Sequence, residues 1–265
     1  MSRFKVETFR LPRHSLRPGS NPLNIAQISD THFRSWRPEH ERLVRTVNGL
    51  NPDLVLLTGD LITAASRSLE AVRTLCRKLE PRYGLYAVRG NWEIRLAPTL
   101  QKLRAVFADA GCYLLKNEQK VLKTKAGNIA IAGLDDLTRG APDIEETLRS
   151  SRNVDFRILL SHAPLAARLL PPGHNVDLIL TGHTHGGQIR IPWLWRLLLP
   201  TGHGGFSKGL YKLPHCWLYV NRGFGSTGPL RLRFRCPPEV ALFKIGGPLR
   251  TEPGANSSGF LRKTL

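Results

Sequence analysis

Five short groups of residues with metal-binding side chains occur along the chain, each directly after an apolar run. They are Asp30-Thr31-His32, Gly59-Asp60, Gly90-Asn91, Ser161-His162 and Gly182-His183-Thr184-His185. Carboxylate and imidazole groups together suit first-row divalent metals rather than Mg or Ca alone. A single Asp-x-His or Gly-Asp usually marks a turn or a helix cap. Five such groups in this order are difficult to produce by chance, so we interpret them as one metal-binding set.

The segments between these groups predict the elements that position them. Buried strands are predicted at 23–29, 53–58, 85–89, 128–133, 156–161 and 176–181, and amphipathic helices at 39–50, 66–79, 99–110 and 143–150. This alternation is typical of a layered α/β protein. Ala126-Gly127 indicates a hairpin turn, and two further strands are predicted at 216–221 and 239–245. Because ligand sites of open α/β sheets form beyond the carboxyl ends of the strands, the five groups should gather at one edge.

The ordered groups resemble the signature of the calcineurin-like metallophosphoesterases, which reads D-x-H, G-D, G-N-H-E/D, H and G-H-x-H. The resemblance covers about residues 23–245 and implies an α/β fold, a four-layer αββα sandwich. It implies two divalent metal ions (Mn, Fe, Zn or Co, of which we favour Mn) and hydrolysis by metal-bound hydroxide. Asp60, Asn91 and His183 are the implied catalytic residues. The implied ligands are Asp30, His32 and His185 for one ion, Asn91, His162 and His183 for the other, and Asp60 as a bridge.

One position departs from that family pattern. The chain reads Gly90-Asn91-Trp92-Glu93, whereas the family has a His that lies beside the substrate and helps to protonate the leaving oxygen. An indole donates a hydrogen bond but does not exchange a proton at ordinary pH. The change should therefore slow the cleavage of alkyl esters more than that of phosphoanhydrides. We expect Trp92 to lie beside the substrate. The alternative is a packing role for Trp92 in a weak or inactive enzyme.

The sequence after the last ligand group resembles one branch of the family, which includes membrane-associated bacterial phosphodiesterases and UDP-2,3-diacylglucosamine pyrophosphatases. The resemblance rests on Gly186-Gly187-Gln188-Ile189 and on Asn221-Arg222-Gly223. Some of these pyrophosphatases similarly lack the His. We therefore expect cleavage of a phosphoanhydride or phosphodiester, in particular UDP-2,3-diacylglucosamine in lipid A biosynthesis. The alternatives are a general phosphodiesterase or phospholipid-headgroup hydrolase, and a catalytically weak scaffold of the same fold.

The chain is basic, and the excess charge is unevenly placed. It has 265 residues, 41% of them hydrophobic, and 39 Lys+Arg against 20 Asp+Glu, which gives a net charge of +19. This composition excludes disordered and collagen-like classes. Residues 190–265 hold 12 basic and 2 acidic residues, a net charge of +10. Such a field attracts anionic partners without choosing among them.

Two segments of this basic region are candidates for binding. Residues 191–200 contain two Trp, four Leu and one Arg, which suits a lipid interface, although a loop packed over the sheet would explain them equally well. Arg231, Arg233 and Arg235 alternate, so on a strand they would share one face and could cradle a substrate phosphate. The alternative is an exposed basic edge strand with no ligand.

The remaining expectations concern domains, location and partners. We predict a basic N-terminal segment at 1–22, a single metallophosphoesterase domain at 23–245 and a flexible tail at 246–265. No run approaches the roughly 20 apolar residues of a membrane span, and no export signal is evident. We therefore expect a cytoplasmic protein, peripheral on the cytoplasmic face of the inner membrane. The expected partners are a phosphorylated, lipid-linked small-molecule substrate and an anionic membrane, without a specific nucleic acid, because no nucleic-acid module is evident.

Overall fold

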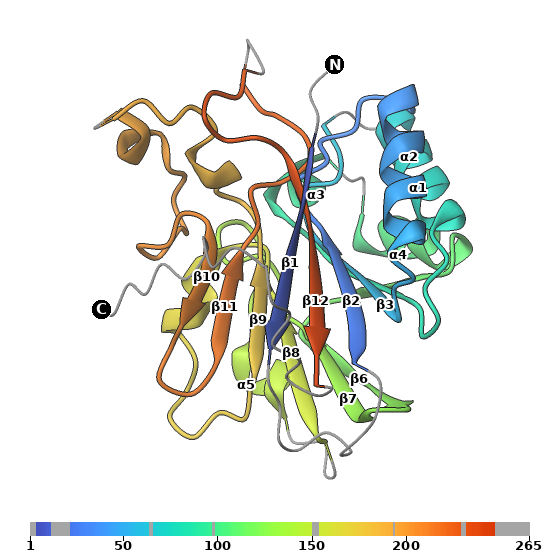
Figure 1. Ribbon diagram of the computed structural model, residues 1–265, viewed down its shortest axis with the longest axis vertical. Helices are drawn as coiled ribbons and strands as arrows, with labels where there is room; N and C mark the ends of the chain where they lie inside the picture. The colour runs from blue at the N-terminus through green and yellow to red at the C-terminus, as the bar shows by residue number, and fades with distance from the viewer. Residues whose placement is uncertain are drawn as a thin grey trace, which may run out of the picture.

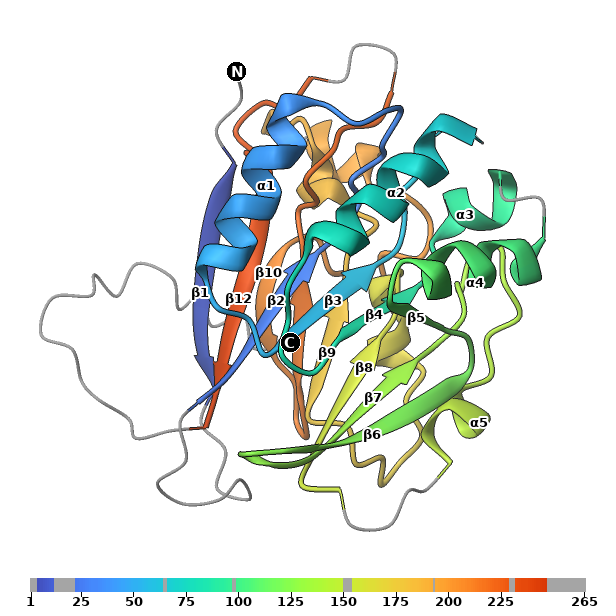
Figure 2. The same cartoon turned by 90° about the vertical axis from the view of Figure 1, so that its right-hand side faces the viewer.

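The computed structural model describes residues 4–11, 22–63, 66–96, 99–149, 154–192, 194–228 and 232–246. Two six-stranded sheets pack face to face, and helices cover their outer faces (Figures 1 and 2). A buried apolar cluster that includes Ile25, Leu56, Ile158 and Leu180 fills the space between the sheets. The structure confirms the predicted α/β fold with two sheets between helices.

The first sheet has the strand order β1-β12-β2-β3-β4-β5. Its strands are β1 Lys5–Leu11, β2 Leu23–Ile28, β3 Leu54–Thr58, β4 Leu85–Val88, β5 Cys112–Leu115 and β12 Glu239–Ile245. Strands β2 to β5 are parallel, whereas β12 runs antiparallel to β2. The carboxyl ends of β2, β3 and β4 therefore lie at the same edge, as the sequence predicts.

The second sheet has the order β10-β11-β9-β8-β7-β6. Its strands are β6 Glu118–Thr124, β7 Gly127–Gly133, β8 Phe156–Leu160, β9 Leu178–Thr181, β10 Gly209–Lys212 and β11 Trp217–Val220. Strands β7, β8, β9 and β11 are parallel, and β6 and β7 form the predicted hairpin. The carboxyl ends of β7, β8, β9 and β11 therefore lie at one edge of the second sheet.

Helices cover both outer faces of the sandwich. The described helices are α1 Pro38–Gly49, α2 Ser66–Lys78, α3 Asn91–Leu96, α4 Leu100–Asp109 and α5 Ile144–Leu148, with 3₁₀ segments η1 Pro164–Arg168, η2 His185–Gly187 and η3 Leu194–Leu198. On α1, Leu43, Val44 and Val47 pack in the cluster on the outer face of the first sheet, as the apolar periodicity predicts. Figure 2 shows α1, α2 and α4 side by side over that face.

Three sequence expectations differ from the structure or lie outside it. Part of the predicted N-terminal segment forms β1, which pairs along its length with β12, so the first sheet extends before residue 23. The strand expected to align the three alternating arginines is wrong for residues 232–235, because this stretch makes only an isolated bridge between Phe234 and Ile189. Arg231 and the tail from residue 247 lie outside the described residues.

Candidate metal centre

The predicted ligands come together where five parallel strands end. Asp30 and His32 follow β2, Asp60 follows β3 and Asn91 follows β4, whereas His162 follows β8 and His183 and His185 follow β9. Five of the seven residues have a left-handed backbone: Asp30, His32, Asp60, His183 and His185, with φ between 45° and 69°. This conformation is uncommon for non-glycine residues, although Asp and His adopt it more often than most, and such residues cluster at functional sites.

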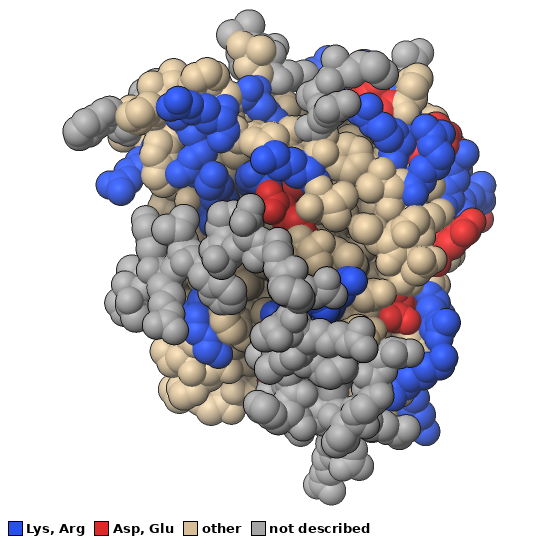
Figure 3. All heavy atoms as spheres, in the orientation of Figure 1, with Lys and Arg blue, Asp and Glu red and all other residues tan. Residues whose placement is uncertain are grey.

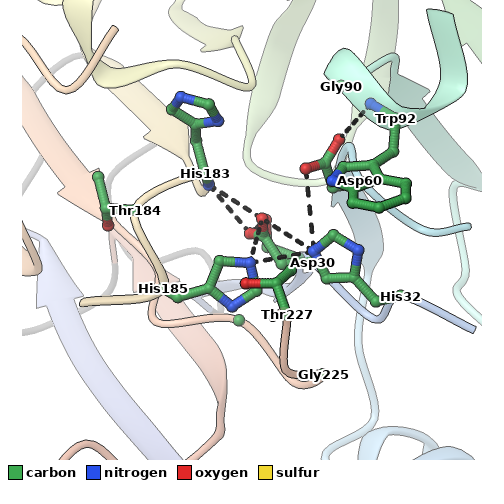
Figure 4. Close-up of polar contacts among 12 residues, drawn as sticks. Asp30, His32, Asp60, Gly90, Trp92, His183, Thr184, His185, Gly225 and Thr227 are labelled. Carbon is green, nitrogen blue, oxygen red and sulfur yellow. Dashed lines mark hydrogen bonds and ion pairs between the residues drawn. The ribbon is translucent and has the colours of Figure 1, made fainter. Parts of the chain in front are cut away.

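The first cluster consists of Asp30, His32 and His185, all of them buried (Figure 4). Nε2 of His185 lies 3.0 Å from Nε2 of His32 and 3.4 Å from Oδ1 of Asp30. Oδ1 of Asp30 is 4.0 Å from Nε2 of His32. One ligand atom from each residue therefore faces a common point.

The second cluster consists of Asp60, His162 and His183, which are also buried. Nε2 of His162 lies 3.0 Å from Nδ1 of His183, 3.2 Å from Oδ2 of Asp60 and 3.2 Å from Oδ1 of Asn91. The same Asp60 oxygen is 3.8 Å from Nε2 of His32 in the first cluster. The Asp60 carboxylate thus lies between the two clusters.

Hydrogen bonds outside the second cluster orient its rings. Nδ1 of His162 lies 2.9 Å from the carbonyl oxygen of Thr58, and Nε2 of His183 lies 2.6 Å from that of Thr201. A carbonyl only accepts, so these nitrogens carry the proton in the neutral rings. The opposite nitrogen of each ring then has a free lone pair that points at the cluster, as in metal-binding histidines.

Burial dominates the electrostatics of the two aspartates. It raises the pKa of Asp30 to about 7, against the opposing charge of His162. Burial also opposes ionisation of Asp60, but the charge and hydrogen bond of His162 outweigh burial and lower the pKa of Asp60 to about 2. An ionised Asp60 beside a buried Asp30 makes the site favourable for cations.

The histidines split into two groups. Burial, followed by the charge of His162, lowers the pKa of His183 to about 4. Burial, with His32 and Arg233 nearby, lowers the pKa of His185 well below its usual value. For His162 burial is outweighed by Asp60, which raises the pKa of His162 well above its usual value. At neutral pH the first two imidazoles are therefore neutral, the form that binds metal.

The two clusters fit a dinuclear metal centre. They offer imidazole nitrogens, two carboxylates and the Asn91 amide, a donor set that suits first-row divalent ions. In each cluster two imidazole nitrogens lie 3.0 Å apart. The carboxylates next to them are buried away from water. A bound cation would stabilise such buried carboxylates.

Glycines keep the ligand loops close together. A Cβ on Gly182 would collide with Oγ of Ser29 and Oδ2 of Asp30, and a Cβ on Gly90 would collide with Oδ1 of Asp60. Distances this short do not occur for real side chains, so a larger residue would displace both carboxylates. Gly90 and Gly182 are therefore required for the ligands to approach one another.

Glu93 is a site residue to which the sequence analysis gave no role. It is 1% exposed, and its carboxylate accepts hydrogen bonds from the backbone N of Gly90, Asp60, Leu61 and Ile62. Burial and the charge of Asp60 raise the pKa of Glu93 to about 7. Glu93 ties the loop after β3 to the loop after β4. Its place in the Gly90-Asn91-Trp92-Glu93 motif was the available signal.

The expected substrate-binding residues lie in different surroundings. The backbone N of Trp92 donates to Oδ1 of Asp60 at 2.8 Å, and its ring contacts His32 edge to face. Arg233 turns inward: its Nη2 lies 3.2 Å from Nδ1 of His185 and 2.8 Å from the carbonyl oxygen of Arg222. Arg235 is exposed. The expectation that Arg233 and Arg235 share one strand face is therefore wrong, and their contact with substrate stays a prediction.

The comparisons with known proteins agree with this geometry. A family model described as calcineurin-like phosphoesterase matches residues 23–187. The chain belongs to this family. The phosphoesterase is 35% identical over 232 residues to YkuE, an uncharacterized metallophosphoesterase of Bacillus subtilis, which covers 86% of this chain and 80% of YkuE. As a member of this family it is a hydrolase that acts on phosphoesters.

Two further known proteins are similar to the phosphoesterase. A transmembrane protein with a metallophosphoesterase domain from Bos taurus is 32% identical over 248 residues, 87% of this chain and 55% of the bovine protein. The solved structure of an archaeal phosphodiesterase aligns with a TM-score of 0.44 and 12% identity over 76% of this chain and 84% of its own. Within the described part of the phosphoesterase, no helix combines the length and apolar character needed to cross a bilayer.

Proposed function

We propose that the chain is a dinuclear-metal phosphohydrolase. In this proposal Asp30, His32 and His185 hold one divalent ion, Asn91, His162 and His183 hold the other, and Asp60 bridges them. The observation that carries it is the position of Asp60, whose Oδ2 lies 3.2 Å from Nε2 of His162 and 3.8 Å from Nε2 of His32. When bound, such a pair of ions lowers the pKa of water towards neutrality and polarises a phosphoryl oxygen. Manganese is the metal that we favour.

The residues of the chain have separate tasks in this scheme. The Asp60 carboxylate would reduce the repulsion between the two bound cations. Asp60 is itself held by the backbone N of Trp92, and its loop is held by Glu93. Asn91 and His183 complete the face on which a phosphoryl group would lie. No protein nucleophile is required.

Trp92 supports a substrate with a weakly basic leaving group. Its ring lies edge to face against His32, with the centroids 5.7 Å apart, and the Arg95 guanidinium lies 5.7 Å from the centroid of the indole. The indole cannot protonate a leaving alkoxide, whereas a leaving phosphate needs no proton. We infer a phosphoanhydride substrate, and within that class the lipid A precursor UDP-2,3-diacylglucosamine, which would yield UMP.

The test is metal-dependent release of UMP from UDP-2,3-diacylglucosamine by the purified protein in Mn²⁺. We expect release in the wild type and none in Asp60→Ala, whereas Asp109→Ala, a change at an exposed position on α4, should behave as the wild type. Absence of UMP release in the wild type would overturn the substrate. Hydrolysis of bis-p-nitrophenyl phosphate in the same preparation would then favour the general phosphodiesterase or phospholipid-headgroup hydrolase.

We also propose peripheral contact with an anionic membrane through one surface, which we call the basic apolar patch. Ile191, Leu197, Leu232 and Phe234 are 43% to 81% exposed there, and the bridge between Ile189 and Phe234 joins their two segments. Figure 3 shows Lys and Arg side chains gathered in the upper left of the view. Figure 1, in the same orientation, shows the segment around η3 there. The charged members of the patch are Arg190, Arg196 and Arg235. Exposed apolar residues between arginines match the interface of an anionic bilayer.

Vesicle sedimentation tests this contact. We expect binding to vesicles that contain phosphatidylglycerol, weaker binding to neutral phosphatidylcholine, and loss of binding at high salt, because screening weakens the arginine attraction. Leu197→Ser should reduce binding at least fivefold. Val121→Ser on β6, at a position 43% exposed, is the matched control and should bind normally. Equal binding of both variants would refute the patch.

A further inference from the structure

A basic pocket lies next to the metal centre and has no role in the scheme above. Its volume is about 260 Å³. Thr31 and His32 are among its lining residues, and His32 also belongs to the first cluster. Any group bound there would be adjacent to a phosphoryl group held at the metals.

Charge gives the pocket a preference for anions. Arg34, Arg37 and Arg42 line it, against one acidic residue, Glu39, so the lining has a net charge of about +2. Arg34 and Arg37 are exposed, so they are free to reach a ligand. Arginine is the side chain best suited to phosphate, because its planar guanidinium donates two parallel hydrogen bonds.

Aromatic rings form another part of the lining. Phe4 and Phe224 contact each other edge to face with centroids 5.3 Å apart, and the Arg42 guanidinium lies 5.9 Å from the centroid of Phe4. Phe33 also lines the pocket and is 1% exposed. Flat aromatic faces next to arginines favour a ligand that carries a flat ring.

The wall of the pocket is tied to the metal loop. The backbone N of Gly225 donates to the carbonyl oxygen of Asp30 at 2.7 Å, and the backbone N of Phe224 donates to that of Ser29 at 2.9 Å. Nε of Arg233 donates to the carbonyl oxygen of Gly225 at 2.9 Å. These bonds fix the distance between the pocket and the first cluster, so both can act on one substrate.

We propose that this pocket binds the nucleotide portion of the substrate, with a phosphate at Arg34 and Arg37 and the base against Phe4 and Phe224. This proposal rests on the proposed phosphohydrolase function, since it names the part of the substrate that extends away from the metals. It assigns a specificity that a general phosphodiesterase would not need. Substrates with one phosphate and no nucleotide would gain nothing from the arginines.

The binding test uses the full chain without added metal. Calorimetric titration with uridine 5′-monophosphate should show saturable binding that Arg34→Ala/Arg37→Ala weakens at least tenfold. Inorganic phosphate and uridine alone should each bind more weakly than the nucleotide. Arg45→Ala is the matched control, because this exposed arginine lies on α1 and does not line the pocket. Absence of nucleotide binding in the wild type, or equal affinity in the double variant, would overturn the pocket.

A kinetic test separates this proposal from the proposed function. In the Mn²⁺-loaded enzyme, the double variant should lower kcat/KM for UDP-glucose relative to that for bis-p-nitrophenyl phosphate by at least tenfold. An unchanged ratio would overturn the nucleotide pocket and leave the hydrolase standing. No hydrolysis of any phosphoester by the wild type would overturn the proposed function, and the binding titration would still decide the pocket.

Discussion

Replacement of the buried carboxylate of Glu93 should destabilise the protein, because four backbone N–H groups donate to it. Oε2 accepts from the backbone N of Gly90 at 2.7 Å and Asp60 at 2.8 Å, and Oε1 accepts from that of Leu61 at 2.6 Å and Ile62 at 3.1 Å. In Glu93→Gln an amide NH₂ replaces one oxygen and faces two N–H donors. Each buried donor that loses its acceptor costs about 1–3 kcal/mol. We therefore expect the free energy of unfolding to fall by about 2–6 kcal/mol.

Urea denaturation in the presence of a chelator measures this change without a contribution from metal. Glu70→Gln is the control: Glu70 is exposed and pairs with Arg73 at 2.9 Å, so its loss should cost no more than about 1 kcal/mol. Because Glu93 also holds the loops of Asp60 and Asn91, calorimetry should show weaker Mn²⁺ binding in Glu93→Gln only. A free energy of unfolding of Glu93→Gln within about 1 kcal/mol of the wild-type value, together with unchanged Mn²⁺ affinity, would contradict this role of Glu93.

Three further predictions concern packing and charge. Gly182→Ala places a Cβ against Oδ2 of Asp30, so metal analysis after dialysis against Mn²⁺ should find fewer than two ions per chain; two ions would contradict the close approach. Burial lowers the pKa of His40 below 6.5, so the unfolded chain takes up the proton first and stability falls as the pH drops below 6.5. The fall in melting temperature between pH 7.5 and 5.5 should be smaller in His40→Gln, and an equal fall would exclude His40 as the cause. Glu239→Gln removes the buried carboxylate that pairs with Arg222 and leaves Glu7, which is 38% exposed, as the other acidic partner, so it should lower the free energy of unfolding by about 2–3 kcal/mol; a loss below about 1 kcal/mol in urea denaturation would show that the pair contributes little.

The parallel core of the fold is predictable from the sequence, because its strands are continuous apolar runs. The predicted strand at 156–161 is β8 Phe156–Leu160, and the one at 85–89 is β4 Leu85–Val88. Both are buried on both faces, which favours apolar residues, and the buried Arg157 of β8 is the one charged residue in these two strands. Strands β5 and β10 lie at the edges of their sheets and are only partly buried, so their apolar signal is weaker than that of β4, which has the same length. β1 is an edge strand with several exposed residues, so its apolar signal is weak.

The ligand groups are predictable because parallel strands place their carboxyl ends together, whatever the details of the loops. The surroundings of the arginines are not predictable in this way. Alternation places Arg233 and Arg235 on one strand face, whereas Arg233 instead donates to the carbonyl oxygens of Gly223 and Gly225. Those partners lie eight and ten residues away, and only the folded loop brings them within reach. Glu93 is comparable, since three of its four donors belong to another loop.

The most direct test of the account is the metal content of the purified protein measured together with its hydrolysis of bis-p-nitrophenyl phosphate. We expect two Mn²⁺ ions per wild-type chain after loading, loss of hydrolysis on chelation and recovery on return of Mn²⁺. Asp60→Ala should bind fewer than two ions and should not hydrolyse the ester, because Asp60 lies between both clusters. Full hydrolysis by the chelated wild type or by Asp60→Ala would contradict a dinuclear centre at these residues.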